Sequence, residues 1–238
     1  MIFWSSVFLS LSCILSAGDA VLVGRQGSAS GGKTCQLNKW DILFFLSSWQ
    51  MFNLGIWQNY LATTQVADPY RIASFLCGLL TIFYIVRSDI KISAAISREA
   101  VKEWLMWTII LLGILLPIGF SIGFLRWNPK LEMNLLKTII LDYFIFVAIT
   151  EELVWRGLFY NLAKRIMSDK SALLLTTAFF AVIYTHIASG GHFPNWPYVG
   201  MAFLAGGAYG ISYYRTGNIL VPILIHGTVD SIWRIFFS

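Results

Sequence analysis

The residues best suited to chemistry lie in the C-terminal half, inside stretches that are otherwise apolar. Glu151 and Glu152 are adjacent, and Arg156 follows four positions after Glu152, so Glu152 and Arg156 share one helical face and are placed to pair. Glu151 lies about 100° further round the helix and can face a different cavity. Because an ionisable group inside an apolar span is costly, each one needs a reason. We predict that Glu152 stays ionised beside Arg156 in a supporting role, whereas Glu151 is desolvated and serves as a general base.

Two histidines and an aspartate supply the other polar groups in these apolar stretches. His186 ends an apolar run, and His226 and Asp230 are four residues apart on one helical face. A carboxylate beside an imidazole fixes its tautomer and raises its basicity. The plainer interpretations are a hydrogen-bonded core histidine at position 186 and a polar clamp between helices at 226 and 230.

Together, the carboxylates and the two histidines are a set of residues that could catalyse hydrolysis. A carboxylate and one imidazole can hold and deprotonate a water, while a second imidazole donates to the oxyanion that forms when that water attacks an amide. The same residue types also suit a catalytic zinc ion with a water in its open position. The metalloprotease signature H-E-x-x-H is absent. We therefore predict a site without a cofactor, with zinc as the open alternative.

The composition predicts that these residues sit in a membrane protein. Of 238 residues, 12% are charged and 57% are apolar, and the mean hydropathy is +0.69. Soluble domains average about 25% charged residues. Open strands cannot satisfy their backbone in lipid, so the predicted fold is all-α, a polytopic membrane bundle of seven to eight transmembrane helices. No basic stretch interleaves with aromatic residues, so nucleic-acid binding is not expected.

Apolar segments divide the chain into three regions. We expect an N-terminal hydrophobic segment and cytoplasmic linker at 1–40, the first transmembrane helices at 41–129, and a catalytic transmembrane core at 130–238. The apolar segments after the linker recur at 42–64, 72–86, 104–125, 135–160, 172–188, 198–214 and 219–236.

Basic residues orient the chain in the membrane. If the later segments alternate in direction, one side receives most of the lysines and arginines, including those of the 87–102 run, and this side is expected to be cytoplasmic. Residues 2–17 are then predicted to form a short reverse anchor, with an interfacial segment or a cleaved signal as the alternatives. The protein is expected to be a multi-pass integral membrane protein. It would lie in the cell (inner) membrane of a bacterium, or in the endoplasmic reticulum or another organelle membrane of a eukaryote.

This topology allows the polar residues to meet. At a rise of about 1.5 Å per residue from the cytoplasmic ends, Glu151 lies roughly 18 Å deep, His186 roughly 22 Å and His226 roughly 10 Å. These depths are compatible with one pocket within the bilayer.

Three motifs in this order resemble the CPBP family of intramembrane proteases, also called Abi, which includes the type II CAAX prenyl endopeptidases. Glu151, Glu152 and Arg156 match the family's E-E-x-x-x-R motif, and His186 matches the histidine of its second motif. The third motif is a histidine followed four positions later by Asn or Asp, and it is matched by His226 and Asp230. Val182 stands where the family's second motif has phenylalanine. The resemblance covers roughly residues 130–236.

The resemblance implies an endopeptidase described as glutamate-dependent, with an older metalloprotease description. By this resemblance, Glu151 and His186 would activate the water. His226 and Asp230 would form the oxyanion side, and Glu152 with Arg156 would support the site. The implied partners are membrane lipids and a peptide or protein substrate near the membrane, for which prenylated and leader-bearing segments are the candidates.

Other classes of function remain open from the sequence. Intramembrane glutamate and histidine also act as proton relays, so a proton- or ion-coupled transporter is one alternative, although no inverted repeat is visible. A catalytically inactive membrane scaffold of the same family is another. A serine nucleophile at Ser212 is disfavoured, because Tyr213 follows where rhomboid-type enzymes need glycine.

Overall fold

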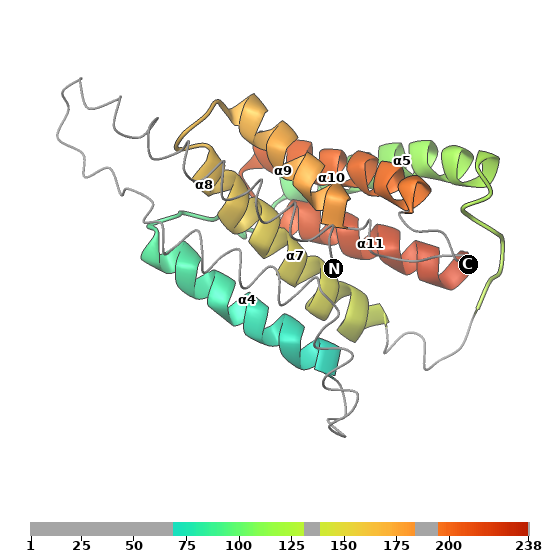
Figure 1. The fold of residues 1–238 in the computed structure, drawn as a ribbon, viewed down its shortest axis with the longest axis horizontal. Coiled ribbons are helices and arrows are strands. Elements are labelled where there is room, and N and C mark those ends of the chain that lie inside the picture. Colours follow the sequence, from blue (N-terminus) through green and yellow to red (C-terminus); the bar gives the residue numbers. More distant parts are fainter. Residues whose placement is uncertain (1–68, 131–138, 184–194, 238) are drawn as a thin grey trace, which may run out of the picture. The chain divides into compact units, whose positions relative to one another are not determined.

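The structure is a computed structural model that describes residues 69–130, 139–183 and 195–237. These residues form six helical segments (Figure 1), and the all-α prediction is confirmed for them. They are α4 (Pro69–Arg87), α5 (Arg98–Ser121), a composite helix over 139–163, α9 (Asp169–Ile183), α10 (Trp196–Thr216) and α11 (Leu220–Phe236). Within the described ranges the only β interactions are two isolated bridges, Ser93 with Asn218 and Trp127 with Phe237.

The number of membrane spans stays a prediction. Helix α5 is the one helix among the described residues that is long and apolar enough to cross a membrane. The apolar part of α4, Phe75–Arg87, is shorter than a full span. The predicted reverse anchor at 2–17, the linker at 18–39 and the first long apolar segment at 42–64 lie outside the described residues.

Polar side chains set the ends of the helices that carry the site. The Ser97 side chain accepts a hydrogen bond from the Ala100 N–H at the start of α5, and Asn195 does the same for the Tyr198 N–H at the start of α10. Helix α10 ends at Thr216, and the capping residue Gly217 has a φ of 62°, which is left-handed and therefore favours glycine. The Asn218 side chain then accepts from the Leu220 N–H, which starts α11 one turn later.

The composite helix carries both glutamates of the first motif. It consists of the π-helical η1 (Ile139–Ile149), a short α-helical α7 (Thr150–Glu152), the π-helical η2 (Leu153–Tyr160) and a final α8 (Asn161–Ala163). π-Helical turns are rare and frequently occur at functional sites. Their wider winding changes which residues share a face, so side-chain directions along this helix depart from the usual spacing of 3.6 residues per turn.

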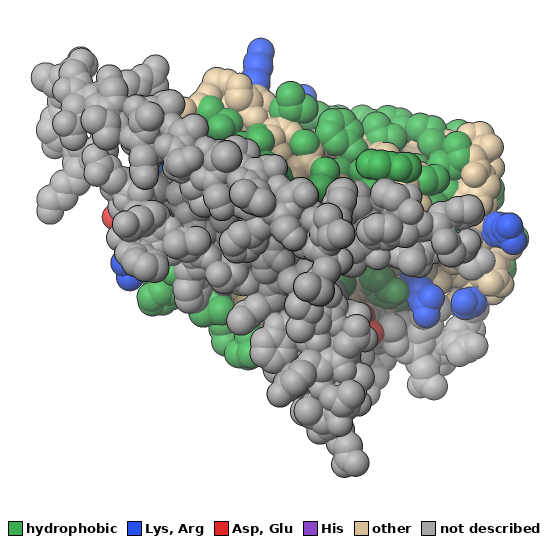
Figure 2. Space-filling view, viewed as in Figure 1, with side chains coloured by type: hydrophobic (Ala, Val, Ile, Leu, Met, Phe, Trp, Pro, Cys, Tyr) green, Lys and Arg blue, Asp and Glu red, His purple; other side chains and the backbone are tan. Residues whose placement is uncertain are grey.

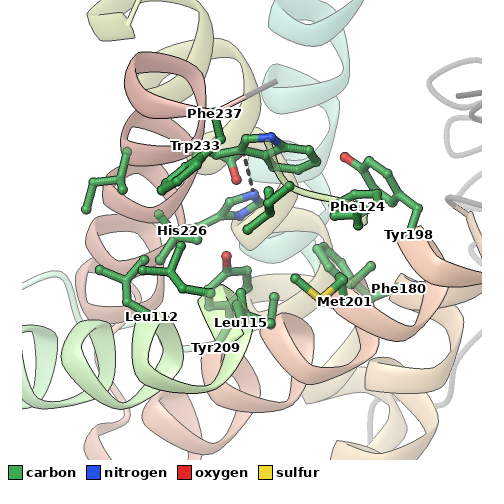
Figure 3. A pocket seen from close by; sticks show the side chains of 17 residues that line it. Leu112, Leu115, Phe124, Phe180, Tyr198, Met201, Tyr209, His226, Trp233 and Phe237 are labelled. Carbon is green, nitrogen blue, oxygen red and sulfur yellow. Dashed lines mark ion pairs between the residues drawn. The ribbon is translucent and has the colours of Figure 1, made fainter. Parts of the chain in front are cut away.

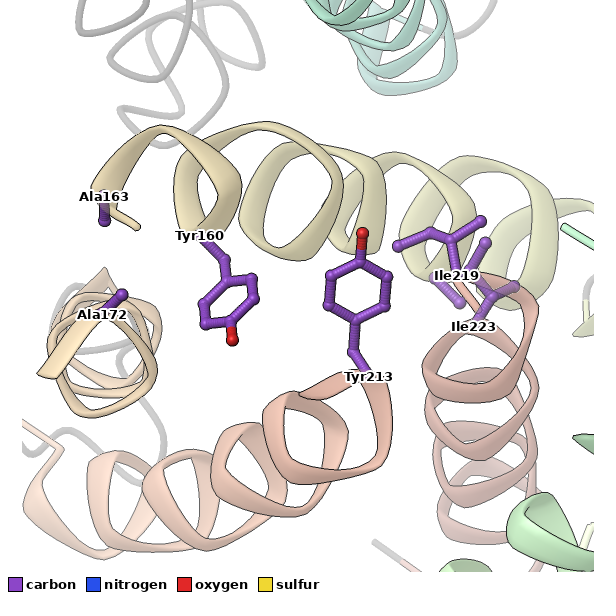
Figure 4. Close-up of a cluster of buried hydrophobic side chains, with 7 residues drawn as sticks. Tyr160, Ala163, Ala172, Tyr213, Ile219 and Ile223 are labelled. Carbon is purple, nitrogen blue, oxygen red and sulfur yellow. The ribbon is translucent and has the colours of Figure 1, made fainter. Parts of the chain in front are cut away.

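Close helix packing fixes the relative positions of these elements. Helix α10 packs against α9, α5 and α11, and α11 also packs against α5 and η1. A buried cluster joins the composite helix to its neighbours (Figure 4): the Tyr160 and Tyr213 rings meet edge to face with centroids 5.8 Å apart, and Ala163 lies opposite Ala172. The Tyr213 hydroxyl also accepts a hydrogen bond of 3.0 Å from Asn161 Nδ2. The polar residues of the site are therefore held by tightly packed helices.

Many large apolar side chains of the described helices are exposed. Ile109 on α5 is 70% exposed, and Phe75 and Phe83 on α4 are each more than half exposed. On the face drawn in Figure 2, hydrophobic side chains cover most of the visible coloured surface, and Lys and Arg side chains lie toward its margins. Such a surface is unusual for a soluble protein and suits contact with lipid.

Candidate active site

The first motif forms a buried ion pair. Arg156 Nη1 donates to Glu152 Oε1 at 2.9 Å, which is the pairing expected from their spacing. Arg156 Nη2 donates to the carbonyl oxygen of Gly206 in α10 at 2.7 Å. Glu152 and Arg156 are 0% and 1% exposed. One arginine therefore ties the composite helix to α10 and compensates the charge of a fully buried carboxylate.

His226 extends this pair into a chain of polar groups. Its Nδ1 lies 2.8 Å from Glu152 Oε1, and its Nε2 lies 3.4 Å from Asp230 Oδ2. Because an ionised carboxylate only accepts hydrogen bonds, Nδ1 carries a hydrogen and donates it in a hydrogen bond to Glu152. The Nε2 contact with Asp230 is longer, and Asp230 is partly exposed, with 22% of its side chain accessible. The chain of contacts from Arg156 through Glu152 and His226 to Asp230 therefore begins at fully buried side chains and ends at a partly exposed one.

Aromatic rings surround the imidazole. The Tyr209 ring stacks on His226, with centroids 4.6 Å apart and planes 16° apart, and Phe180 meets the imidazole edge to face at 6.1 Å. The Arg156 guanidinium carbon lies 4.8 Å from the Phe180 centroid. These contacts exclude water from the Glu152–His226 hydrogen bond and fix the ring orientation.

A cavity of about 80 Å³ opens beside the imidazole (Figure 3). Helices α5, α10 and α11 and the segment after α5 supply most of its walls, which are largely aliphatic and aromatic. His226, Asp230 and Tyr209 bring polar atoms to the lining. A small apolar space with a few converging polar groups is the usual form of a substrate site.

Glu151, the predicted general base, is also buried in the composite helix. It is 6% exposed, and it is not among the residues that line the cavity. His186 lies outside the described residues, so its approach to Glu151 stays a prediction. Of the six residues predicted for the site, the structure brings together four, Glu152, Arg156, His226 and Asp230.

Three contacts in this arrangement were not predicted from the sequence. They are the carbonyl of Gly206, the stacked ring of Tyr209 and the edge contact of Phe180. The glycine-rich run around 205–210 was the available signal, because a Cβ on Gly206 would lie 2.7 Å from the Phe180 ring. The Ser212 hydroxyl donates to the Tyr209 carbonyl within its own helix, which leaves the serine alternative without geometric support.

The zinc alternative was tested against the donor set. Within the described ranges, no three His, Cys, Asp or Glu side chains are grouped so that they could hold a metal ion. His186, which the zinc alternative would use as a ligand, lies outside the described residues, so zinc stays an open alternative.

The described helices thus place a buried carboxylate and an imidazole beside an apolar cavity. Residues 133–232 match the family model described as type II CAAX prenyl endopeptidase Rce1-like. The family resemblance predicted from the three motifs is thereby confirmed over this region, and the family is one of membrane peptidases. Comparisons with curated proteins and with solved structures gave no match.

The glycine after the site histidine is expected to be essential for packing. A methyl group on Gly227 would lie 2.5 Å from two ring carbons of Phe144 in η1, so Gly227→Ala forces α11 and η1 apart. We expect a loss of about 1–3 kcal/mol in stability, as overpacking produces. Gly113→Ala is the matched control, because nothing lies within 4 Å of the methyl it would add to α5. Thermal unfolding in detergent measures both; equal melting temperatures for the two variants would contradict the packing seen here.

Proposed function

We propose that this protein is an intramembrane endopeptidase that cleaves a membrane-proximal peptide or protein with a water activated by Glu151 and His186. The family match supports a peptidase. The observation that carries the proposal is the buried Arg156–Glu152–His226 chain, which ends at a cavity. If these polar residues only held the helices together, they would not need a cavity beside His226.

The reaction follows from the roles of these groups. Glu151 takes a proton from a water held with His186, and the resulting hydroxide attacks the carbonyl carbon of the peptide bond. The carbonyl oxygen becomes an oxyanion and accepts a hydrogen bond from Nε2–H of His226 when that nitrogen is protonated. The proton held by Glu151 passes to the leaving nitrogen, the C–N bond breaks, and a carboxylic acid and an amine are released; the acid then gives its proton to the amine or to solvent.

The buried chain serves this reaction by keeping His226 in place. Glu152 accepts a hydrogen bond from Nδ1–H and so directs Nε2 away from itself, while the Asp230 carboxylate lies near Nε2 and balances a positive imidazole from the other side. Arg156 donates a hydrogen bond to the buried Glu152 carboxylate and compensates its charge. The supporting pair therefore acts through the histidine and touches no substrate.

The substrate proposed here is a segment that reaches the site from the membrane. The cavity walls are apolar, and the family description names prenyl endopeptidases, so prenylated C-termini are candidates together with leader-bearing peptides. The protein would act as a multi-pass membrane enzyme in contact with lipids.

Hydrolysis that resists chelation is the expected result of the first assay. The protein is purified in detergent and offered a library of prenylated and unprenylated peptides with and without a strong chelator, and cleavage is followed by mass spectrometry. Because Glu151 and His186 suffice to activate the water, the chelator is expected to change the rate by less than about 2-fold, well under the contribution of a general base. Loss of cleavage with chelator and its return with zinc would contradict the metal-free mechanism. Absence of cleavage of every peptide, with proton flux in vesicles, would favour the transporter instead.

A further inference from the structure

Tyr209 is held rigidly against the catalytic imidazole. It is 1% exposed, its ring is stacked on His226, and Phe180 lies edge-on to it at 6.2 Å. The guanidinium carbon of Arg156 lies 5.5 Å from the ring centroid. In Figure 3 the side chain extends from α10 toward His226. These contacts involve the ring alone, and a phenylalanine would make all of them.

The hydroxyl of Tyr209 has a different environment from its ring. Tyr209 lines the cavity that His226 and Asp230 also line, and across the described ranges its hydroxyl makes no hydrogen bond. A buried tyrosine hydroxyl normally finds a protein partner. Tyr213, one turn further along α10, follows that rule, since its hydroxyl accepts from Asn161. A polar group placed in an apolar site without a protein partner costs free energy unless a ligand supplies the partner.

We infer that the Tyr209 hydroxyl is a substrate-binding donor, which donates to the same carbonyl oxygen as Nε2 of His226. This inference rests on the proposed peptidase function and deepens it. The phenol is neutral, so it donates its O–H to the developing oxyanion and keeps its proton throughout. The hydroxyl and the imidazole would form a two-donor oxyanion site whose geometry is fixed by the stacked rings.

Tyr209→Phe tests the inference, because it removes one oxygen atom and keeps the stacked ring. The peptide that the wild-type protein cleaves fastest is used as substrate. We expect kcat to fall about 100-fold while KM changes little, as for the loss of one oxyanion donor. Tyr213→Phe is the matched control in the same helix and is expected to keep kcat within about 3-fold, a change of well under 1 kcal/mol in the barrier.

A second measurement separates this role from a structural one. A phosphinate analogue of the same peptide mimics the tetrahedral oxyanion, and its inhibition constant is expected to rise in Tyr209→Phe by about the same factor as kcat falls, because both report transition-state binding. A purely structural role would weaken binding of the substrate and the phosphinate alike. Unchanged kcat and phosphinate affinity in a folded Tyr209→Phe, with Glu151→Gln inactive, would overturn the inference and leave the proposed function intact. If the wild-type protein cleaves no peptide, the proposed function fails first, and the inference fails with it.

Discussion

Glu151→Gln is expected to abolish peptide hydrolysis in a protein that still folds and still binds substrate. A general base contributes about 10²–10⁴-fold to the rate, and an amide cannot accept the proton of the attacking water. Glutamine has nearly the same size as glutamate, so the buried site of this residue stays filled. Single-turnover cleavage measures the loss, and equilibrium binding of the same peptide shows that the site is intact. Glu99→Gln, on the exposed first turn of α5, is the control with the same chemical change and is expected to cleave normally.

The neighbouring glutamate provides the sharpest test of this assignment. Glu152, and not Glu151, is the carboxylate that contacts His226. In Glu152→Gln the amide oxygen can still accept from Arg156 and His226, but the negative charge that supports a positive imidazole is gone. We expect partial activity in Glu152→Gln and none in Glu151→Gln. The reverse order, with both variants folded, would transfer the general-base role to Glu152. Cleavage retained in both would remove the glutamate mechanism altogether.

The sequence predicted local pairs better than long-range contacts. The spacing of four residues identified both Glu152 with Arg156 and His226 with Asp230, since such pairs depend only on winding within one helix. It did not reveal that Glu152 and His226, 74 positions apart, are joined by a hydrogen bond. That contact depends on how α11 packs against the composite helix, which is set by details such as the close approach of Gly227 and Phe144.

The π-helical winding of the composite helix is a second feature that the sequence does not reveal. The angle between Glu151 and Glu152 was predicted from ordinary α-helical geometry, and these two residues do lie in the short α-helical turn α7. The segments before and after them are π-helical, so residues further along the helix point in directions that a period of 3.6 does not give. Tyr209 was visible only as one aromatic residue among many, and its place on His226 required the three-dimensional arrangement of α10 and α11.

Breaking the buried ion pair is expected to have the largest effect on stability. Arg156→Met removes the guanidinium partner of the fully buried Glu152 and leaves the Gly206 carbonyl without the Nη2 donor. Removing one partner of a buried pair costs about 3–5 kcal/mol. Arg215 makes a geometrically similar pair with Glu103, also at 2.9 Å, but 53% of the Arg215 side chain is exposed. Because solvent screens such pairs, Arg215→Met is expected to cost less than about 1 kcal/mol. Thermal unfolding followed by tryptophan fluorescence compares the two variants in the same detergent.

The double variant Glu152→Gln with Arg156→Met separates charge compensation from packing. If the cost of Arg156→Met comes from the stranded carboxylate, neutralising that carboxylate is expected to restore most of the lost stability, because a buried site without charges avoids the desolvation penalty. Hydrolysis is not expected to return, since His226 still lacks the charged acceptor for its Nδ1 proton. A double variant as unstable as Arg156→Met alone would show that the arginine stabilises the fold through the Gly206 carbonyl and the Phe180 ring. The ion pair would then support the imidazole without contributing to folding.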